Sequence, residues 1–182
     1  MPMESVIEMK HIIYFTGMPG AGKTYWGKKV AESLQLPFAD LDEYIEKRKQ
    51  ISIAEYWAQH GEAAFRTLES ECLLELIDLV EPYTVIACGG GTPAYNGNMA
   101  KMKASGFVIY LRIGFKQLME HLEHEGHKRP LFTENKFQLH EKLEVLLKER
   151  KKYYEQANFI LDFESISLPI FTEIIKKCLN LP

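Results

Sequence analysis

One stretch near the N-terminus matches the pattern G-x-x-x-x-G-K-[ST] at every fixed position: Gly17-Met18-Pro19-Gly20-Ala21-Gly22-Lys23-Thr24. Glycines in such a loop let backbone N–H groups turn toward a polyphosphate, and the following helix adds the partial positive charge of its N-terminus. The lysine can reach the terminal phosphates, and the threonine hydroxyl can join the shell of a Mg²⁺ ion. An apolar run at 11–15 precedes the loop and a helical pattern at 25–34 follows it, as this chemistry requires. The pattern predicts a binding site for a nucleoside triphosphate.

Two aspartates, Asp40 and Asp42, flank Leu41 at the end of a short strand-like stretch. If Leu41 points into the core, both carboxylates point the other way, at the sheet edge that carries the phosphate loop. One could then order the water around a metal ion while the other orients an acceptor hydroxyl. The apolar run at 83–88 ends without an acid, which favours Asp40 as the metal-side residue. The alternative is that both acids stabilise the start of a helix near Glu43, and the pair alone leaves both interpretations open.

Three glycines in a row, Gly89, Gly90 and Gly91, follow the strand-like run at 83–88. Such a sequence allows the backbone to approach a ligand closely and exposes its N–H donors. A tight turn rarely needs three glycines, so the pattern favours a ligand-binding loop.

Two arginines lie on predicted helices. Arg150 occupies a helical stripe that is otherwise apolar, and a guanidinium there requires an anion. That anion could be a structural Asp or Glu, or the carboxylate of a substrate, which arginine binds as a fork. Arg66 lies beside an apolar stripe, and its spacing favours an ordinary pair with Glu62 or Ser70. The members of these stripes are Leu139, Leu143, Leu146, Tyr153 and Ala157 for the first, and Phe65, Leu68, Cys72 and Leu76 for the second.

A polar interruption at 124–135 contains the basic sequence His127-Lys128-Arg129-Pro130-Leu131. A lid that closes over the triphosphate could use Arg129 to stabilise the transferred phosphoryl group and could exclude water. The segment could equally be an ordinary solvated loop, and its sequence alone does not decide.

Composition narrows the class of protein. The chain has 182 residues, enough for one α/β core and too few for two ordinary domains, so we expect one domain over 1–182. A net charge of −3 gives no reason to expect a nucleic-acid or membrane partner. The three cysteines form no C-x-x-C pair, and neither a signal-peptide pattern nor a membrane-length apolar run is present. We therefore expect a cytoplasmic protein, and we expect it to be a monomer.

Strand-like and helix-like patterns alternate along the chain. This alternation predicts a parallel sheet with helices on both faces and sites at the carboxyl ends of the strands. A capping box at Ser52 and Glu55 predicts a short helix that starts at Ser52. The expected strands cover 11–16, 37–40, 83–88, 107–111 and 158–162, and the other expected helices cover 23–35, 61–80, 97–104, 115–124, 136–156 and 167–179.

Taken together, the motifs resemble the shikimate kinase family over about residues 12–163. They occur in the order typical of that family: Gly17–Thr24, Phe38-x-Asp40-x-Asp42, Gly61-Glu62-x-x-Phe65-Arg66, Gly89–Gly91, Arg129-Pro130-Leu131, and Glu149-Arg150 followed by Tyr154 and Ala157. The resemblance implies a P-loop three-layer sandwich of the nucleoside-monophosphate-kinase type. It has a five-stranded parallel sheet with helices on both faces, a substrate-binding region at about 38–66 and a lid at about 124–135.

The resemblance also implies an activity: transfer of the ATP γ-phosphate to the 3-hydroxyl of shikimate in aromatic amino acid biosynthesis, with Mg²⁺. Asp42 would bind the shikimate hydroxyls and act as or assist the base, and Asp40 would hold the metal through water. Arg66 and Arg150 would clamp the carboxylate, while Gly89–Gly91, chiefly Gly90, would contact the ring hydroxyls. The remaining roles fall to the phosphate loop, with Gly17, Pro19, Gly20, Ala21 and Gly22 around the phosphates, Thr24 on Mg²⁺, and Lys23 and Arg129 stabilising the phosphoryl group.

The chain departs from the family at two places. The stretch 118–125 lacks the arginine that commonly packs against adenine, and Lys151-Lys152 stands where a proline is common.

A gluconate kinase or another small-metabolite kinase is the nearest alternative function. A nucleoside monophosphate kinase is disfavoured by the small number of lid arginines. From another class, a nucleotide-gated binding module without turnover is disfavoured by the intact Lys23, Thr24, Asp40, Asp42 and Arg129.

Overall fold

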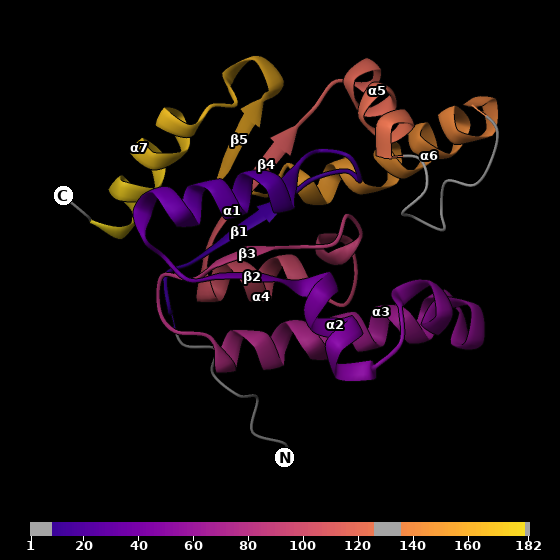
Figure 1. Ribbon diagram of the computed structural model, residues 1–182, viewed down its shortest axis with the longest axis horizontal. Coiled ribbons are helices and arrows are strands. Elements are labelled where there is room, and N and C mark those ends of the chain that lie inside the picture. The colour runs from indigo at the N-terminus through magenta and orange to yellow at the C-terminus, as the bar shows by residue number, and fades with distance from the viewer. Residues whose placement is uncertain (1–8, 126–135, 181–182) are drawn as a thin grey trace.

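A five-stranded sheet forms the middle of the molecule. The computed structural model describes residues 9–125 and 136–180 (Figure 1). The strands are arranged in the order β2-β3-β1-β4-β5, and every neighbouring pair is parallel, as the sequence predicts. Their bounds are β1 Ile12–Thr16, β2 Phe38–Asp40, β3 Val85–Ala87, β4 Gly106–Arg112 and β5 Phe159–Asp162.

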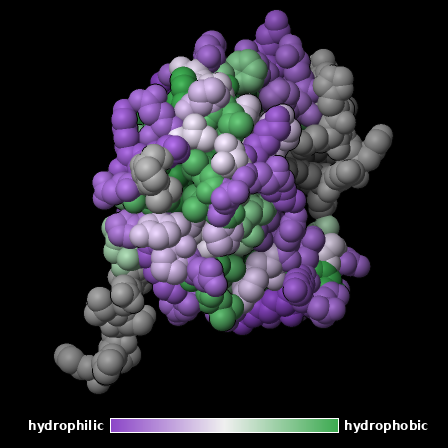
Figure 2. Space-filling model, turned by 60° about the vertical axis from the view of Figure 1, so that its left-hand side comes forward, coloured by the Kyte–Doolittle hydropathy of each residue, from purple (hydrophilic) through white to green (hydrophobic). Residues whose placement is uncertain are grey.

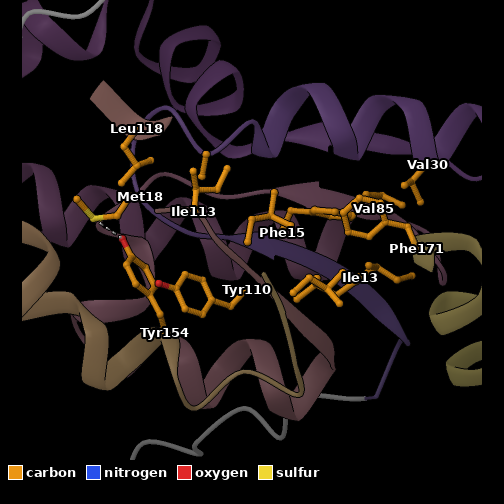
Figure 3. Packing of buried hydrophobic residues seen from close by; sticks show 14 of the residues in the cluster. Ile13, Phe15, Met18, Val30, Val85, Tyr110, Ile113, Leu118, Tyr154 and Phe171 are labelled. Carbon is orange, nitrogen blue, oxygen red and sulfur yellow. Dashed lines mark hydrogen bonds between the residues drawn. The ribbon is translucent and has the colours of Figure 1, made fainter. Parts of the chain in front are cut away.

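The central strand β1 is buried on both faces, since all five of its residues are inaccessible to solvent. Successive side chains of a strand point to opposite faces of a sheet. Accordingly, Ile13 and Phe15 belong to one hydrophobic core, while Ile12 and Tyr14 belong to the other. In Figure 3, Phe15 lies in the first core beside Phe171 of the C-terminal helix, with ring centroids 5.2 Å apart.

Each core is completed by helices on its own side of the sheet. The first core takes side chains from α1 Lys23–Leu34, α5 Phe115–Glu125, α6 Lys136–Tyr154 and α7 Leu168–Leu179. The second takes side chains from α2 Leu41–Lys49, α3 Ile53–Leu79 and α4 Asn98–Ser105. Two short 3-10 turns, η1 Thr92–Ala94 and η3 Phe163–Ser165, follow β3 and β5. The arrangement is a three-layer sandwich, which confirms the predicted fold class.

The helix after Ser52 differs from the prediction in one respect. Ser52 forms both bonds of the capping box with Glu55, as predicted, but α3 then runs to Leu79 as one element with a break inside it. The break is at Gly61, whose φ of 78° and ψ of 175° are not helical. Glycine adopts this conformation without the penalty that a Cβ would impose. The predicted short and long helices are therefore two arms of α3.

The helix α2 matches the helix near Glu43 that the sequence left open as an alternative, and it was not predicted from an apolar pattern. Its sequence is rich in charge, and only Leu41 and Ile45 are buried, so it has a weak apolar stripe. Its start is fixed by a side-chain cap from Asp40, the last residue of β2.

The surface is largely polar. Figure 2 shows one face, on which hydrophilic side chains surround a narrow central strip of hydrophobic ones. Within residues 9–125 and 136–180, none of the helices combines the length and the apolar character needed to cross a bilayer.

Candidate active site

The phosphate loop joins the carboxyl end of β1 to the N-terminus of α1. Gly20 and Gly22 have φ values of 82° and 80°, which favour glycine and turn the loop tightly. Among the described residues, no side chain caps α1, and its first turn carries no acid. Lys23 is 7% exposed, and its Nζ donates to the carbonyl of Met18 over 2.9 Å. The loop therefore presents a buried amine beside a helix N-terminus, which together bind anions.

Thr24 and Asp40, the two residues predicted to lie near the metal, are in contact. The Thr24 hydroxyl donates to Oδ2 of Asp40 over 2.7 Å. The other carboxylate oxygen, Oδ1, accepts from the backbone N–H groups of Asp42 and Glu43 at 2.9 and 3.3 Å and so caps α2. Oδ1 therefore confirms the helix-capping interpretation for Asp40, while Oδ2 lies beside Thr24, where the metal-side interpretation places it.

The donor set at this point fits Mg²⁺. A hydroxyl and a carboxylate lie side by side next to the phosphate loop, and hard oxygen ligands are those that Mg²⁺ prefers. The described residues contain no cluster of three or more His, Cys, Asp or Glu that could hold a metal ion alone.

Asp42 faces a different loop from Asp40. Leu41 between them is completely buried, as predicted, which places the two carboxylates away from the core. A Cβ added to Gly89 would lie 3.0 Å from Oδ1 of Asp42, so this carboxylate lies against the start of the glycine loop. One aspartate therefore faces the phosphate loop and the other faces the Gly89–Gly91 loop.

Arg66 is buried beneath the glycine loop. It is 6% exposed, and its Nη1 donates to Oε2 of Glu69 over 2.8 Å. Nε and Nη2 also lie 3.4 Å from Oε1 of Glu62, the partner that the sequence suggests. A Cβ on Gly91 would come within 2.5–2.6 Å of the guanidinium, so only glycine permits this approach. The ring of Tyr95 covers the guanidinium, with its centroid 4.5 Å from Cζ.

Glu69 is a site residue that the sequence analysis missed. It is 1% exposed, and its Oε1 accepts from the Thr92 hydroxyl over 2.6 Å while its Oε2 accepts from Arg66. The available signal was its place three residues after Arg66, which puts the two side chains on one face of α3.

Arg150 is buried at the other side of the glycine loop. It is 5% exposed, as its apolar stripe predicts, although the stripe continues through Tyr154 rather than Tyr153. The Tyr154 hydroxyl forms hydrogen bonds with the carbonyl of Gly90 and with the Arg150 side chain. Burial raises the pKa of Tyr154, whereas the positive charges of Arg150 and Arg66 act to lower it. Both guanidinium groups therefore lie within electrostatic range of one hydroxyl.

The buried thiol of Cys88 lies at the centre of the charged groups. Burial raises its pKa well above the usual value, and the charges of Glu69, Asp40 and Asp42 raise it further, while Lys23 acts to lower it. The structure thus brings the predicted Lys23, Asp40 and Asp42 together at one edge of the sheet.

Arg129, with residues 126–135 of the predicted lid, lies outside the described residues. His121 of α5 is partly buried, and its Nδ1 lies 2.8 Å from the carbonyl of Gly20 in the phosphate loop. The reason is that α5 packs on this loop: a Cβ on Gly20 would lie 3.0 Å from Leu122.

A phosphate loop and buried arginines at one edge of the sheet suit transfer of a phosphoryl group to a small acid. The fold and the site define the class of P-loop small-molecule kinases. Comparison with known proteins agrees, since the family model for shikimate kinase matches residues 19–179. The chain belongs to the shikimate kinase family.

Individual shikimate kinases are similar to this chain over most of its length. A shikimate kinase of Dictyoglomus turgidum is 37% identical over 173 residues, which cover 93% of this chain and 98% of the relative. The solved structure of a shikimate kinase from Bacteroides thetaiotaomicron has a TM-score of 0.84 at 32% identity, over 94% of this chain and 99% of the other. A shikimate kinase from Acinetobacter baumannii in complex with shikimate has a TM-score of 0.78 at 29% identity, over 99% and 96%.

The buried pair of Arg66 and Glu69 leads to a stability prediction. Glu69→Gln removes the buried charge that compensates the guanidinium, and we expect a loss of about 1–3 kcal/mol in the free energy of unfolding. Glu62→Gln is the matched control, because Glu62 is half-exposed and its contact is longer, so its loss is expected to stay below about 1 kcal/mol. Urea denaturation of both variants measures the difference. Equal losses would show that Glu69 does not stabilise Arg66.

Proposed function

We propose that this protein transfers the γ-phosphoryl group of ATP to the 3-hydroxyl of shikimate, giving 3-phosphoshikimate and ADP. The observation that supports this most directly is the convergence of Arg66 and Arg150 on the glycine loop, which also contacts Asp42 and the phosphate loop. A carboxylate held between the arginines would place the rest of a small ring against Gly89–Gly91. Its hydroxyls would then lie between Asp42 and the phosphate loop.

The proposed roles follow from charge and position. Arg150 and Arg66 bind the acceptor carboxylate, because arginine forms forked, charge-assisted bonds with such groups. Asp42 accepts a hydrogen bond from the reacting hydroxyl and orients it as a base. Lys23, with Arg129 of the lid, stabilises the charge of the transferred phosphoryl group. Catalysis of this reaction consists mainly of positioning and electrostatic stabilisation, which these groups supply.

Mg²⁺ would be held by the Thr24 hydroxyl and, through water, by Asp40. When bound, the ion neutralises charge on the phosphate oxygens. The backbone N–H groups of the phosphate loop, which Pro19 lacks but its neighbours carry, would hold the phosphates themselves.

The proposed partners are two small molecules, ATP and shikimate, and the proposed setting is a monomer in the cytoplasm. The three cysteines support that setting, because all are free thiols, two of them buried.

Gluconate phosphorylation remains the alternative within the same class. A gluconokinase from Sinorhizobium meliloti has a TM-score of 0.58 at 16% identity, a likeness that extends to the fold alone. The glycine loop beside Arg66 favours shikimate, because a compact ring can pack against a backbone surface without side chains.

The direct test is ADP release measured with shikimate, quinate, gluconate and AMP as acceptors. We expect turnover with shikimate that exceeds turnover with each of the others by at least about a hundredfold, as is typical when buried polar groups recognise the acceptor. Turnover with gluconate alone would move the protein to the alternative. Binding of ATP without release from any acceptor would instead favour the binding module.

Arg150→Ala separates the carboxylate site from the nucleotide site. We expect the KM for shikimate to rise about tenfold to a hundredfold, since a charge-assisted bond is worth about 1.5–3 kcal/mol. The Kd for ADP should change little. Arg48→Ala is the control, because Arg48 pairs with Glu75 on the outer part of α2 and α3. Equal damage to shikimate and ADP binding by Arg150→Ala would contradict the carboxylate assignment.

Asp40→Asn separates the cap of α2 from the metal. Asparagine caps helices about as well as aspartate, so the melting temperature should be nearly unchanged. The Mg²⁺ concentration for half-maximal activity should rise about tenfold, since the lost charge lies beside Thr24. Titration of free Mg²⁺ at fixed ATP measures this, with the exposed Glu43→Gln as control. An unchanged Mg²⁺ requirement would remove Asp40 from the metal site.

A further inference from the structure

Tyr154 is the last residue of α6 and has no exposed surface. It follows Arg150 by four residues, so the two side chains lie on one face of the helix. Its ring stacks on the ring of Tyr110 in β4, with centroids 4.9 Å apart and planes inclined by 23°. Figure 3 shows the Tyr154 hydroxyl directed away from Tyr110, toward Met18. The stack therefore fixes where the hydroxyl lies.

The Tyr154 hydroxyl has one proton and several neighbours. It donates the proton to the carbonyl of Gly90 and accepts a hydrogen bond from the Arg150 side chain. The sulfur of Met18 lies 3.7 Å away. One oxygen atom thus contacts the glycine loop, the arginine of α6 and the phosphate loop.

The two loops are also in direct contact with each other. A Cβ on Gly90 would lie 2.9–3.2 Å from atoms of Pro19, so the glycine loop rests on the phosphate loop. The carbonyl of Met18, next to Pro19, accepts the hydrogen bond from Lys23. A shift of Gly90 would therefore reach the residue that holds the phosphate-binding lysine.

The partner of Arg150, the Tyr154 hydroxyl, carries no charge. A phenol is neutral, so it can hold a guanidinium in one direction without cancelling its charge. Arg66, by contrast, is paired with Glu69 and Glu62. The ion pairs among residues 9–125 and 136–180 include none for Arg150. Because the Tyr154 hydroxyl is neutral, it leaves the positive charge of Arg150 to attract an incoming carboxylate.

We propose that Tyr154 is a positioning residue whose hydroxyl orients Arg150 for the acceptor carboxylate and links the acceptor loop to the phosphate loop through Gly90. This inference rests on the proposed function. Tyr154 does not touch the substrates, and it acts through the two groups that do. Binding of nucleotide and binding of acid are coupled through this hydroxyl.

The test compares Tyr154→Phe with Tyr14→Phe. Both tyrosines have no exposed surface, and Tyr14 also donates or accepts one strong bond, 2.6 Å to the Ser105 hydroxyl, remote from the loops. Each change removes one buried hydroxyl and keeps the ring. We expect Tyr154→Phe to raise the KM for shikimate about tenfold or more, and Tyr14→Phe to leave it within about twofold, while both lower the melting temperature. Equal effects on KM would overturn the proposal.

The coupling between nucleotide binding and acid binding is measured by calorimetric titration with shikimate, in the absence and in the presence of ADP. We expect ADP to tighten shikimate binding to the unaltered protein and to Tyr14→Phe, and to do so much less in Tyr154→Phe. A Tyr154→Phe variant that keeps the full effect of ADP, or an unaltered protein that shows none, overturns the link between the loops.

A double variant tests whether Tyr154 acts through Arg150. In the Arg150→Ala background, Tyr154→Phe should change the shikimate Kd by less than about twofold. If the two residues acted independently, the fold-change in Kd of the double variant would be the product of the two single fold-changes. Such a product would overturn the positioning role. Failure of the proposed function is seen separately, as the absence of shikimate-dependent ADP release by the unaltered protein.

Discussion

Burial of positive charge is the constraint on which the site depends. Lys23, Arg66 and Arg150 are each less than a tenth exposed, and all lie at the carboxyl edge of the sheet. Removing such groups from water costs several kcal/mol unless anions or hydrogen-bond acceptors replace the lost solvation. Arg66 has two glutamates for this purpose, Lys23 donates to the carbonyl of Met18, and Arg150 lies against the hydroxyl of Tyr154. Buried cations at one edge of the sheet are suited to the binding of anionic ligands.

The topology of the sheet brings the parts of the site to one edge. Because all strands are parallel, the loops after β1, β2 and β3 emerge together, and each brings one part of the site. The phosphate loop follows β1, the aspartates follow β2 and the three glycines follow β3. The order β2-β3-β1 then sets their sequence in space, so that the glycine loop lies between the aspartates and the phosphate loop. The contacts of Gly89 with Asp42 and of Gly90 with Pro19 are the result.

Much of this was predictable from sequence, for identifiable reasons. The phosphate loop is encoded locally by glycines and a lysine at fixed spacing, and the strands are short apolar runs, so the sheet and the loop followed directly. The features that the sequence did not predict are of two kinds. Some depend on contacts between distant segments, and others depend on which of two adjacent residues of a helix faces the core. The spacing of Glu69 from Arg66 was a local signal, but its contact with Thr92 joins residues 23 positions apart and could not be predicted from the sequence. The choice between Tyr153 and Tyr154 turns on one residue at the end of α6, where the helix gives way to β5. The helix α2 stayed an open alternative because its cap, Asp40, is also the last residue of a strand.

Cys88 shows a further consequence of placing three acids around one buried point. A thiol attacks electrophiles and oxidants as its thiolate, and burial together with the surrounding negative charge raises the pKa of Cys88 and so disfavours that form. Cys88 packs beside Met102, and we expect alkylating reagents and peroxide to react with it slowly. The acids gathered at this edge of the sheet thus also lower the reactivity of the thiol beside them.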